Sequence, residues 1–282
     1  MTQGKTFKPL PDAFRVLAWG CGTPSTTLGV MSALGDLEPL DAIIHADTGF
    51  EATETQEMRE WYAEWFRDHG LRVEIVSNGN IVKDGAEEHI HIPFFTSDGG
   101  PLQRECTRHF KLTPNKRRVR ELLGYHATKA PHPPAESVEN WLGYTLEEYT
   151  RLSDSRVQFI VNRFPFIERQ MTRQDCAEYL KRQGLPVPPK SACLSCPYRQ
   201  ASEWLHLKRN CPEDWEAAVE FDEANRHNPL AKRGNSTADS LYIYKHGPMP
   251  LAEADLETDA ERERKEQGFQ PPLLCGDGPC FT

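Results

Sequence analysis

The chain reads RVLAWGCGTPS at residues 15–25, and this stretch decides the expected fold. The apolar run at residues 15–19 is typical of a short buried strand, and a glycine-rich turn follows it. Residues 26–34 then predict a helix. A turn that joins a first strand to a first helix lies at the carboxyl edge of a parallel sheet. Backbone N–H groups and the helix N-terminus can hold an anion there.

The alternation of strand and helix continues along the chain. Apolar side chains recur at helical spacing over residues 54–69, between strands expected at residues 41–46 and 71–76. This order predicts an α/β fold with a central, mainly parallel sheet of about five strands and flanking helices. We expect a nucleotide-binding α/β domain at residues 1–170 and a helical C-terminal region at residues 171–282. Further strands are expected at 138–144 and 157–161, and helices at 113–123, 172–183, 200–208 and 212–226.

Length and composition narrow the class of protein. The chain has 282 residues, 38% of them apolar, which is enough to build a sizeable core. No apolar run approaches the roughly 20 residues that span a bilayer, and the N-terminus lacks a secretory signal. We therefore expect a cytoplasmic protein without membrane association. The net charge of −9 disfavours nucleic-acid binding over the whole surface.

The glycine-rich turn is the first candidate binding site. Gly20 and Gly22 would let the backbone approach a phosphate closely, and Ser25, Thr26 and Thr27 would add hydroxyl donors. An ordinary glycine-containing turn remains the alternative, because short glycine loops are weak signals.

The second expected strand ends in an acid. Asp47 stands where it would face a nucleotide or a bound magnesium ion. A plain turn, with Thr53 capping the next helix, is the alternative for this segment.

The eight cysteines predict metal or redox chemistry, because a reducing compartment disfavours disulfides. Cys193 and Cys196 are separated by two residues, so their thiolates can hold one metal ion or one edge of a cluster. A thioredoxin-like redox pair is the alternative, although a proline-rich linker precedes this pair rather than a strand. Cys21 and Cys211 look incidental, and Cys21 is expected to oxidise easily within the turn.

Five segments in this order resemble one superfamily. The glycine-rich turn, ADTGFEATET at 46–55, CTRHFK at 106–111, TRQDC at 172–176 and KSACLSCPYR at 190–199 resemble the PP-loop, or adenine nucleotide α-hydrolase-like, proteins. Within that superfamily the chain looks most like phosphoadenosine phosphosulfate (PAPS) reductase-like proteins of bacterial or phage type.

The resemblance implies a nucleotide, either ATP or PAPS, at the glycine-rich turn; magnesium is left open. It places Thr48 and Gly49 in the nucleotide site, with Arg108 and Lys111 facing phosphate or sulfate. The usual family turn is Ser-Gly-Gly-x-Asp-Ser, whereas this chain has Gly20 at the first position and Pro24 at the acidic one. This departure argues against a pyrophosphatase reaction more strongly than it argues against nucleotide binding.

The same resemblance implies a 4Fe-4S cluster, with zinc as the alternative. Its expected ligands are Cys106, Cys176, Cys193 and Cys196. Only Cys106 matches the cysteine pair that sulfonucleotide reductases carry there. Cys176 could equally be a buried helix residue. Cys275 and Cys280 are rivals as the fourth ligand, or one of them is the tail nucleophile that reductases use, or both are bystanders.

A basic stretch runs from Arg104 to Arg120, with seven basic residues and one acid. Such runs are often solvated surface, but in an acidic chain this one suggests contact with nucleic acid or a partner protein. Arg117, Arg118 and Arg120 could contact a nucleic-acid backbone.

These features favour an ATP-dependent sulfur-transfer enzyme that thiolates DNA or tRNA within a modification or defence system. It would take sulfur from a donor such as a cysteine desulfurase; a homodimer is left open. Asp47, Cys275 and Cys280 are the candidate catalytic residues. A sulfonucleotide reductase is one alternative, and a non-catalytic nucleotide sensor, favoured by Pro24, is another.

Overall fold

A computed structural model describes residues 9–84, 92–126, 131–232 and 238–266. The chain divides into two compact units that interleave along the sequence. Unit 1 comprises Met1–Asp47, Glu54–Asn78 and Lys111–Ser191. Unit 2 comprises Thr48–Thr53, Gly79–Phe110 and Ala192–Thr282. The sequence suggested a single boundary at residue 170, whereas each of these units is built from three separate stretches of the chain.

Unit 1 contains a five-stranded sheet in which every pairing is parallel, in the order β3-β2-β1-β5-β6. The expected parallel α/β fold is thus confirmed. The order reverses between β1 and β5, which makes their carboxyl ends the switch point of the sheet. The strands are β1 (Phe14–Ala18), β2 (Ala42–Asp47), β3 (Val73–Ser77), β5 (Val138–Trp141) and β6 (Ile160–Arg163).

Alternate residues of the strands supply the two faces of this sheet. Leu17 and Ile43 are paired in the register and belong to one apolar cluster. Val16 and Ala42, one residue earlier on each strand, belong to the other. Successive side chains of a strand point to opposite faces, so both faces of the sheet are buried.

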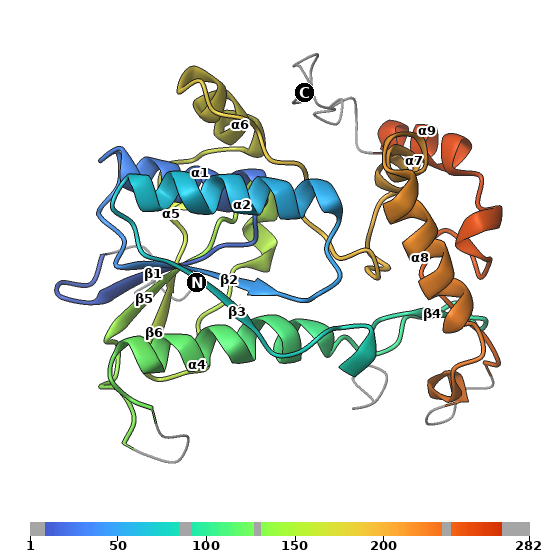
Figure 1. Cartoon of the computed structure of the whole chain (residues 1–282), viewed down its shortest axis with the longest axis horizontal. Coiled ribbons are helices and arrows are strands. Elements are labelled where there is room, and N and C mark those ends of the chain that lie inside the picture. The colour runs from blue at the N-terminus through green and yellow to red at the C-terminus, as the bar shows by residue number, and fades with distance from the viewer. Residues whose placement is uncertain (1–8, 85–91, 127–130, 233–237, 267–282) are drawn as a thin grey trace. The chain divides into compact units, whose positions relative to one another are not determined.

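Helices cover both faces of the sheet, as Figure 1 shows. On one face lie α1 (Thr23–Ala33), α2 (Thr53–Asp68), α5 (Pro165–Glu168) and α6 (Arg173–Arg182), and on the other lies α4 (Thr113–Leu122). Helix α6 packs on α1 and begins with the capping box that Thr172 forms with Asp175. Helix α1 starts at Thr23, earlier than expected, because extended Gly22 is its N-cap and Pro24 fits its first turn.

A buried charge cluster ties β5 to β6 within unit 1. Arg163 pairs with Glu38 at 3.2 Å, with Glu168 at 3.1 Å and with Glu139 at 3.5 Å. The indole of Trp141 also donates to Glu139. Buried charges need such partners, and these bonds satisfy them.

Unit 2 is mainly helical, with α7 (Ala201–Asn210), α8 (Pro212–Ala224) and α9 (Leu256–Glu266) around an apolar cluster that includes Trp204 and Phe221. A short antiparallel pair, β4 (Phe95–Thr96) with β7 (Leu241–Tyr242), completes it. The π-helical segment η2 (Thr107–Leu112) leads directly into α4. None of the described helices has the length and apolar character that a membrane span requires.

Candidate functional site

The glycine-rich turn, here called the Gly loop (residues 20–25), leads from β1 into α1 in unit 1. The hydroxyl of Ser25 accepts from the Gly20 N–H at 3.2 Å and donates to the Gly22 carbonyl at 3.1 Å. The Ser25 side chain therefore closes the Gly loop on itself. Pro24 contributes no N–H, so any anion held here would rely on the remaining backbone donors.

Thr26 and Thr27 lie in the first turns of α1 and are wholly buried. The indole N–H of Trp19 donates to the Thr26 hydroxyl at 3.0 Å. The Thr27 hydroxyl donates to the Thr23 carbonyl at 2.9 Å and lies 3.3 Å from the Cys176 carbonyl. In this conformation both threonine hydroxyls brace α1, and their expected contact with a nucleotide stays a prediction.

Gly143 follows β5 and packs against the Gly loop at the switch point of the sheet. A Cβ at this position would lie 2.7 Å from the Ser25 nitrogen and 3.0 Å from the Pro24 carbonyl carbon. Only glycine allows this approach. The sequence predicted only a strand at 138–144 and gave Gly143 no role, because the contact joins the ends of two strands that are distant in the chain.

Asp47 ends β2, as the sequence suggested, but its carboxylate already has a cationic partner. Arg59 of α2 donates from Nη1 to Asp47 Oδ2 at 2.9 Å. The Asp47 side chain is 31% exposed, so it can still meet solvent. A catalytic or magnesium-binding role for Asp47 therefore stays a prediction and would compete with this ion pair.

In unit 2 the segment after β2 joins the segment that carries Cys193. The Thr48 hydroxyl lies 3.1 Å from the Cys193 thiol, and the Leu194 N–H donates to the Phe50 carbonyl at 2.9 Å. Gly49 has a left-handed φ of 73°, and its carbonyl accepts from Asn80. The Thr48 hydroxyl thus contacts the cysteine segment here, and the expected contact of Thr48 and Gly49 with a nucleotide stays a prediction.

The two cysteines of the Cys193–Cys196 pair form a tight turn, in which the Cys196 N–H donates to the Cys193 carbonyl at 3.1 Å. Arg199 stabilises this turn from inside the protein. Its guanidinium donates to the Cys193 and Ala192 carbonyls at 3.2 and 2.6 Å. Arg199 is only 4% exposed. The sequence reasoning missed this role, since arginine after a cysteine motif first suggests an anion contact.

Cys106 begins the helical segment before η2 and packs against the apolar cluster of unit 2. Burial raises the pKa of its thiol, and the neighbouring Cys193 adds to this, whereas the nearby Arg104 guanidinium opposes it. Arg104 also lies over the ring of Tyr198 at 5.4 Å. Cys106, Cys193 and Cys196 are called the cysteine centre below. Within the part of the chain that the structure describes, no three cysteine sulfur atoms lie within 4.8 Å of one another.

Cys176 lies in unit 1, on α6, and its side chain is fully buried in the apolar cluster there. Burial raises the pKa of this thiol to about 12. A metal ligand must be a thiolate, and this environment favours the protonated form. Its role as a cluster ligand stays a prediction. Cys275 and Cys280 lie outside the described residues.

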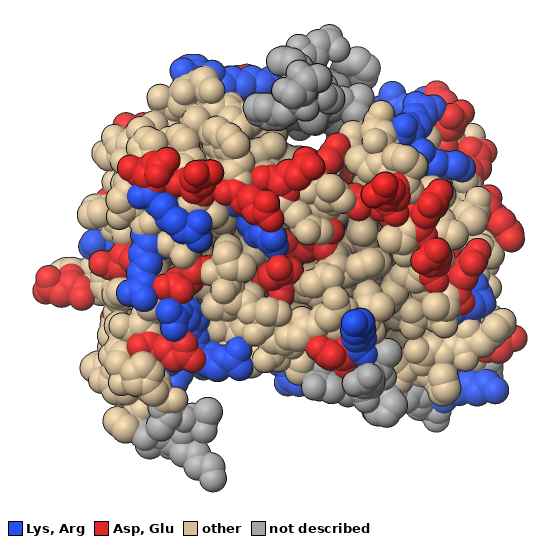
Figure 2. All heavy atoms as spheres, in the orientation of Figure 1, with Lys and Arg blue, Asp and Glu red and all other residues tan. Residues whose placement is uncertain are grey.

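The basic stretch is partly neutralised. Arg118 pairs with Glu74 at 3.1 Å and with Glu121 at 2.8 Å, and Arg117 donates to the Ser77 carbonyl. Arg108 is exposed in unit 2, whereas Lys111 is half-buried in unit 1. Figure 2 shows acidic and basic side chains interspersed over the visible face. A nucleic-acid contact through this stretch stays a prediction.

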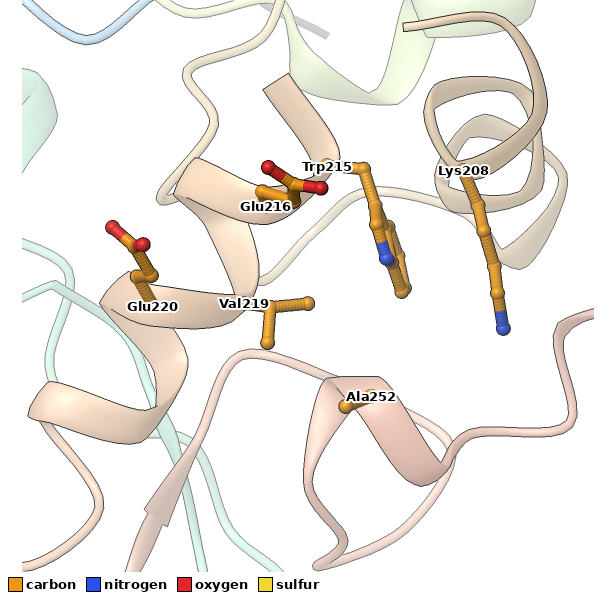
Figure 3. A pocket seen from close by; sticks show the side chains of 6 residues that line it. All are labelled: Lys208, Trp215, Glu216, Val219, Glu220 and Ala252. Atoms are coloured by element: carbon orange, nitrogen blue, oxygen red, sulfur yellow. The ribbon is translucent and has the colours of Figure 1, made fainter. Parts of the chain in front are cut away.

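A separate hollow of about 250 Å³ lies on unit 2 between α7, α8 and the short helix η5 (Leu251–Glu253). Figure 3 shows Trp215 at its centre and the Lys208 side chain extending alongside it. The Lys208 ammonium lies 5.3 Å from the Trp215 ring centroid. None of the residues expected from the sequence to form a site lines this hollow.

Comparison with solved structures gives several likenesses. The fold is the one that the resemblance implies: a five-stranded parallel sheet flanked by helices. The chain is similar to the phosphoadenylyl-sulfate (PAPS) reductase from Candida auris, solved as a phosphate complex. The two share 12% identity with a TM-score of 0.42, over 64% of this chain and 76% of that one. Neither the family models nor the curated proteins gave a match.

Proposed function

We propose that the chain is an adenine-nucleotide-dependent sulfur-transfer enzyme of the PAPS reductase-like type, with an iron–sulfur cluster bound by the cysteine centre. The observation that carries this proposal is the arrangement in unit 2. Three cysteines from two distant segments belong to one compact unit, with the Thr48 hydroxyl directed at one thiol. A hydroxyl 3.1 Å from a sulfur can stabilise the thiolate that a ligand must be.

We favour a cluster of several irons over a single zinc ion, with the resemblance to sulfonucleotide reductases as the main support. Zn–S bonds of about 2.3 Å bring tetrahedral thiolates to about 3.8 Å from one another. No three described thiols come within 4.8 Å, whereas a cluster has a separate iron for each thiolate. Cys106, Cys193 and Cys196 would hold the cluster, with the fourth ligand open between Cys176, Cys275 and Cys280. When bound, such a cluster would supply sulfur or electrons to the reaction.

The nucleotide would bind in unit 1, at the Gly loop. This loop lies at the switch point of the sheet, where parallel α/β sheets bind their ligands. The helix N-terminus and the backbone N–H groups of residues 21–23 are the donors that suit a phosphate. ATP would adenylate an oxygen of a nucleobase or of a DNA phosphate and release pyrophosphate, and a sulfide-level sulfur would then attack the activated atom and expel that oxygen as part of AMP.

The acceptor that we propose is nucleic acid, either DNA or tRNA. The net charge of −9 makes a partner protein necessary to bring nucleic acid close, with the basic stretch as its contact. A cysteine desulfurase is the class of enzyme that would supply the sulfur.

Two observations favour a second candidate, a nucleotide-sensing subunit without catalysis. Pro24 replaces the acid of the usual family loop, and Arg59 already pairs with Asp47, the other acid at this edge of the sheet. A sensor would bind nucleotide at the Gly loop and release no product.

Anaerobic purification tests the cluster directly. We expect a brown protein with about four irons and four sulfides per chain. Cys193→Ser should remove the colour, because Cys193 is one of the proposed ligands and the one that the Thr48 hydroxyl contacts. Ser195→Ala is the matched control, since Ser195 is buried in the same turn between Cys193 and Cys196 but supplies no thiol. A colourless wild-type protein with one zinc per chain would overturn the cluster proposal.

A further inference from the structure

His45 occupies the middle of β2 and is buried inside unit 1, with 2% of its surface exposed. Its Nδ1 lies 3.0 Å from the Trp19 carbonyl and 3.1 Å from the Cys21 thiol. Both partners belong to the segment that forms the Gly loop or leads into it. One ring nitrogen of His45 therefore contacts both the loop, at Cys21, and the residue that precedes it, Trp19.

The chemistry of the two partners fixes the role of Nδ1. A carbonyl oxygen can only accept a hydrogen bond, so the Trp19 contact requires the hydrogen to be on Nδ1. The Cys21 sulfur, on the other side, is then a second acceptor of the same hydrogen. His45 is thus a donor to the loop.

A second contact holds the far end of the same segment. The indole N–H of Trp19 donates to the Thr26 hydroxyl at 3.0 Å, and the Trp19 ring meets His45 edge-on at 5.7 Å. The two residues that flank the Gly loop, Trp19 and Thr26, are therefore joined to each other and to His45 through one buried chain of contacts.

The loop needs such support because Cys21 has a left-handed backbone, with φ of 57°. A residue with a side chain rarely adopts this conformation, and it persists only where its surroundings hold it. Cys21 is 1% exposed, so its thiol faces the interior toward His45 while its backbone forms the turn. The backbone of the turn keeps its shape only while Cys21 keeps this conformation.

We propose that His45 is a positioning residue that holds the Gly loop in its anion-binding conformation through the hydrogen on Nδ1. The proposal rests on the proposed nucleotide site but assigns His45 no contact with the nucleotide, because the ring is buried. It predicts that phosphate affinity depends on a donor at Nδ1 rather than on the bulk of the ring.

Three substitutions separate the donor from the bulk. His45→Asn places an amide nitrogen near the position of Nδ1, His45→Gln places one near Nε2, and His45→Leu retains bulk without a donor. Calorimetry with ATP, repeated with PAPS, gives the affinity of each variant. We expect His45→Asn to bind within about threefold of wild type, whereas His45→Gln and His45→Leu lose about tenfold, as one lost hydrogen bond allows.

A second measurement needs no nucleotide. N-ethylmaleimide labelling of the ligand-free protein, resolved by peptide mass spectrometry, reports how often the loop opens to expose Cys21. We expect labelling of Cys21 to accelerate about tenfold in His45→Gln and His45→Leu and to stay near wild type in His45→Asn. Melting temperatures of the variants are recorded beside both measurements.

Each possible result either supports or overturns the proposed role of His45. Affinity and labelling that follow melting temperature in all three variants, irrespective of the donor, would show a structural role only and overturn the proposal. Wild-type affinity in His45→Leu would overturn it too. Should His45→Leu fail to fold, the comparison of the Asn and Gln variants carries the test. A wild-type protein that binds neither nucleotide would defeat the proposed function, while the Cys21 labelling would still decide the role of His45.

Discussion

In the Gly loop of unit 1 the polar side chains point into the protein, whereas in the cysteine centre of unit 2 the Thr48 hydroxyl points toward the Cys193 thiol. Ser25 bonds within the loop and Thr26 accepts from Trp19, which leaves backbone N–H groups as the binding surface. Thr48 contacts Cys193 instead, and Arg199 supports the same turn from within. A backbone site tolerates side-chain changes but depends on close packing, whereas a side-chain site depends on each ligand. The two regions should therefore respond to different mutations.

The largest effect is expected where the Gly loop is packed most closely. Gly143→Ala would place a Cβ 2.7 Å from the Ser25 nitrogen, so the backbone must shift. We expect destabilisation of about 1–3 kcal/mol from overpacking. ATP affinity should fall about a hundredfold if most of this shift is taken by the loop. Urea unfolding and calorimetry measure the two effects.

The control for this prediction is Gly100→Ala in unit 2, where an added Cβ would meet nothing within 4 Å. Its ATP affinity should match wild type. An unchanged ATP affinity in Gly143→Ala would mean that the Gly loop is not the nucleotide site.

Thiol reactivity should distinguish the cysteine centre from the core of unit 1. In metal-free protein near pH 8, Cys106 should react with iodoacetamide at least roughly tenfold faster than Cys176, because thiolate fraction and exposure control the rate. Cys106 is half-buried, whereas Cys176 is fully buried with a pKa of about 12. Peptide mass spectrometry measures both rates. Equal rates would contradict the expected difference in environment between Cys106 and Cys176.

The raised pKa of the Cys176 thiol predicts that the folded protein loses stability at alkaline pH. The pKa of Cys176 is raised in the folded protein, from 9.0 to about 12, so folding favours its protonated form. Its contribution to the free energy of unfolding is therefore complete below about pH 9 and is lost as the pH rises toward 12. Cys176→Ala should flatten this alkaline decline in urea unfolding.

A smaller effect is expected at the hydroxyl that faces Cys193. Thr48→Val keeps the shape of the side chain but removes the contact with the sulfur. We expect metal affinity to fall about tenfold, in the range of a lost contact to a ligand. Thr96→Val is the matched control, since Thr96 is also buried in unit 2 and donates to the Gly100 carbonyl. Equal losses in both variants would show a general effect of packing.

The smallest effect is expected from the charge cluster of unit 1. Burial raises the pKa of Glu38, but a backbone hydrogen bond and the Arg163 guanidinium outweigh it and hold that pKa below its usual 4.5. A lowered pKa stabilises the fold above about pH 4.5, and this contribution is lost as the pH falls below it. Because Glu38 is partly exposed, we expect only about 0.5 kcal/mol. Urea unfolding of Glu38→Gln should show a shallower acid limb, and an unchanged slope would contradict the assignment.

The sequence predicted the elements of unit 1 well because they depend on local patterns. The apolar face at residues 54–69 became α2, and the helix expected at 172–183 became α6, which Thr172 caps through its bonds to Asp175. In each case the decisive residues are neighbours in the chain.

Contacts between distant segments could not be predicted in this way. The approach of Gly143 to Ser25, the contact of Thr48 with Cys193 and the pairing of His45 with Cys21 depend on how the strands are ordered. Helix α1 is buried on all sides, so Thr26 and Thr27 point inward. The hydroxyl-rich sequence of this helix gives no sign of that burial. Hydroxyl residues in a loop therefore predict donors, but not where they point.

The most direct test of the central claim is a product assay on the anaerobically purified protein. Pyrophosphate release from ATP is measured with DNA, tRNA and candidate partners added in turn, beside thiol-dependent sulfite release from PAPS. We expect pyrophosphate release that requires nucleic acid and disappears in Asp47→Asn, with ATP binding largely retained. Sulfite release that requires Cys275 or Cys280 would identify a reductase instead. Tight nucleotide binding with neither product under any condition would contradict the enzyme and favour the sensor.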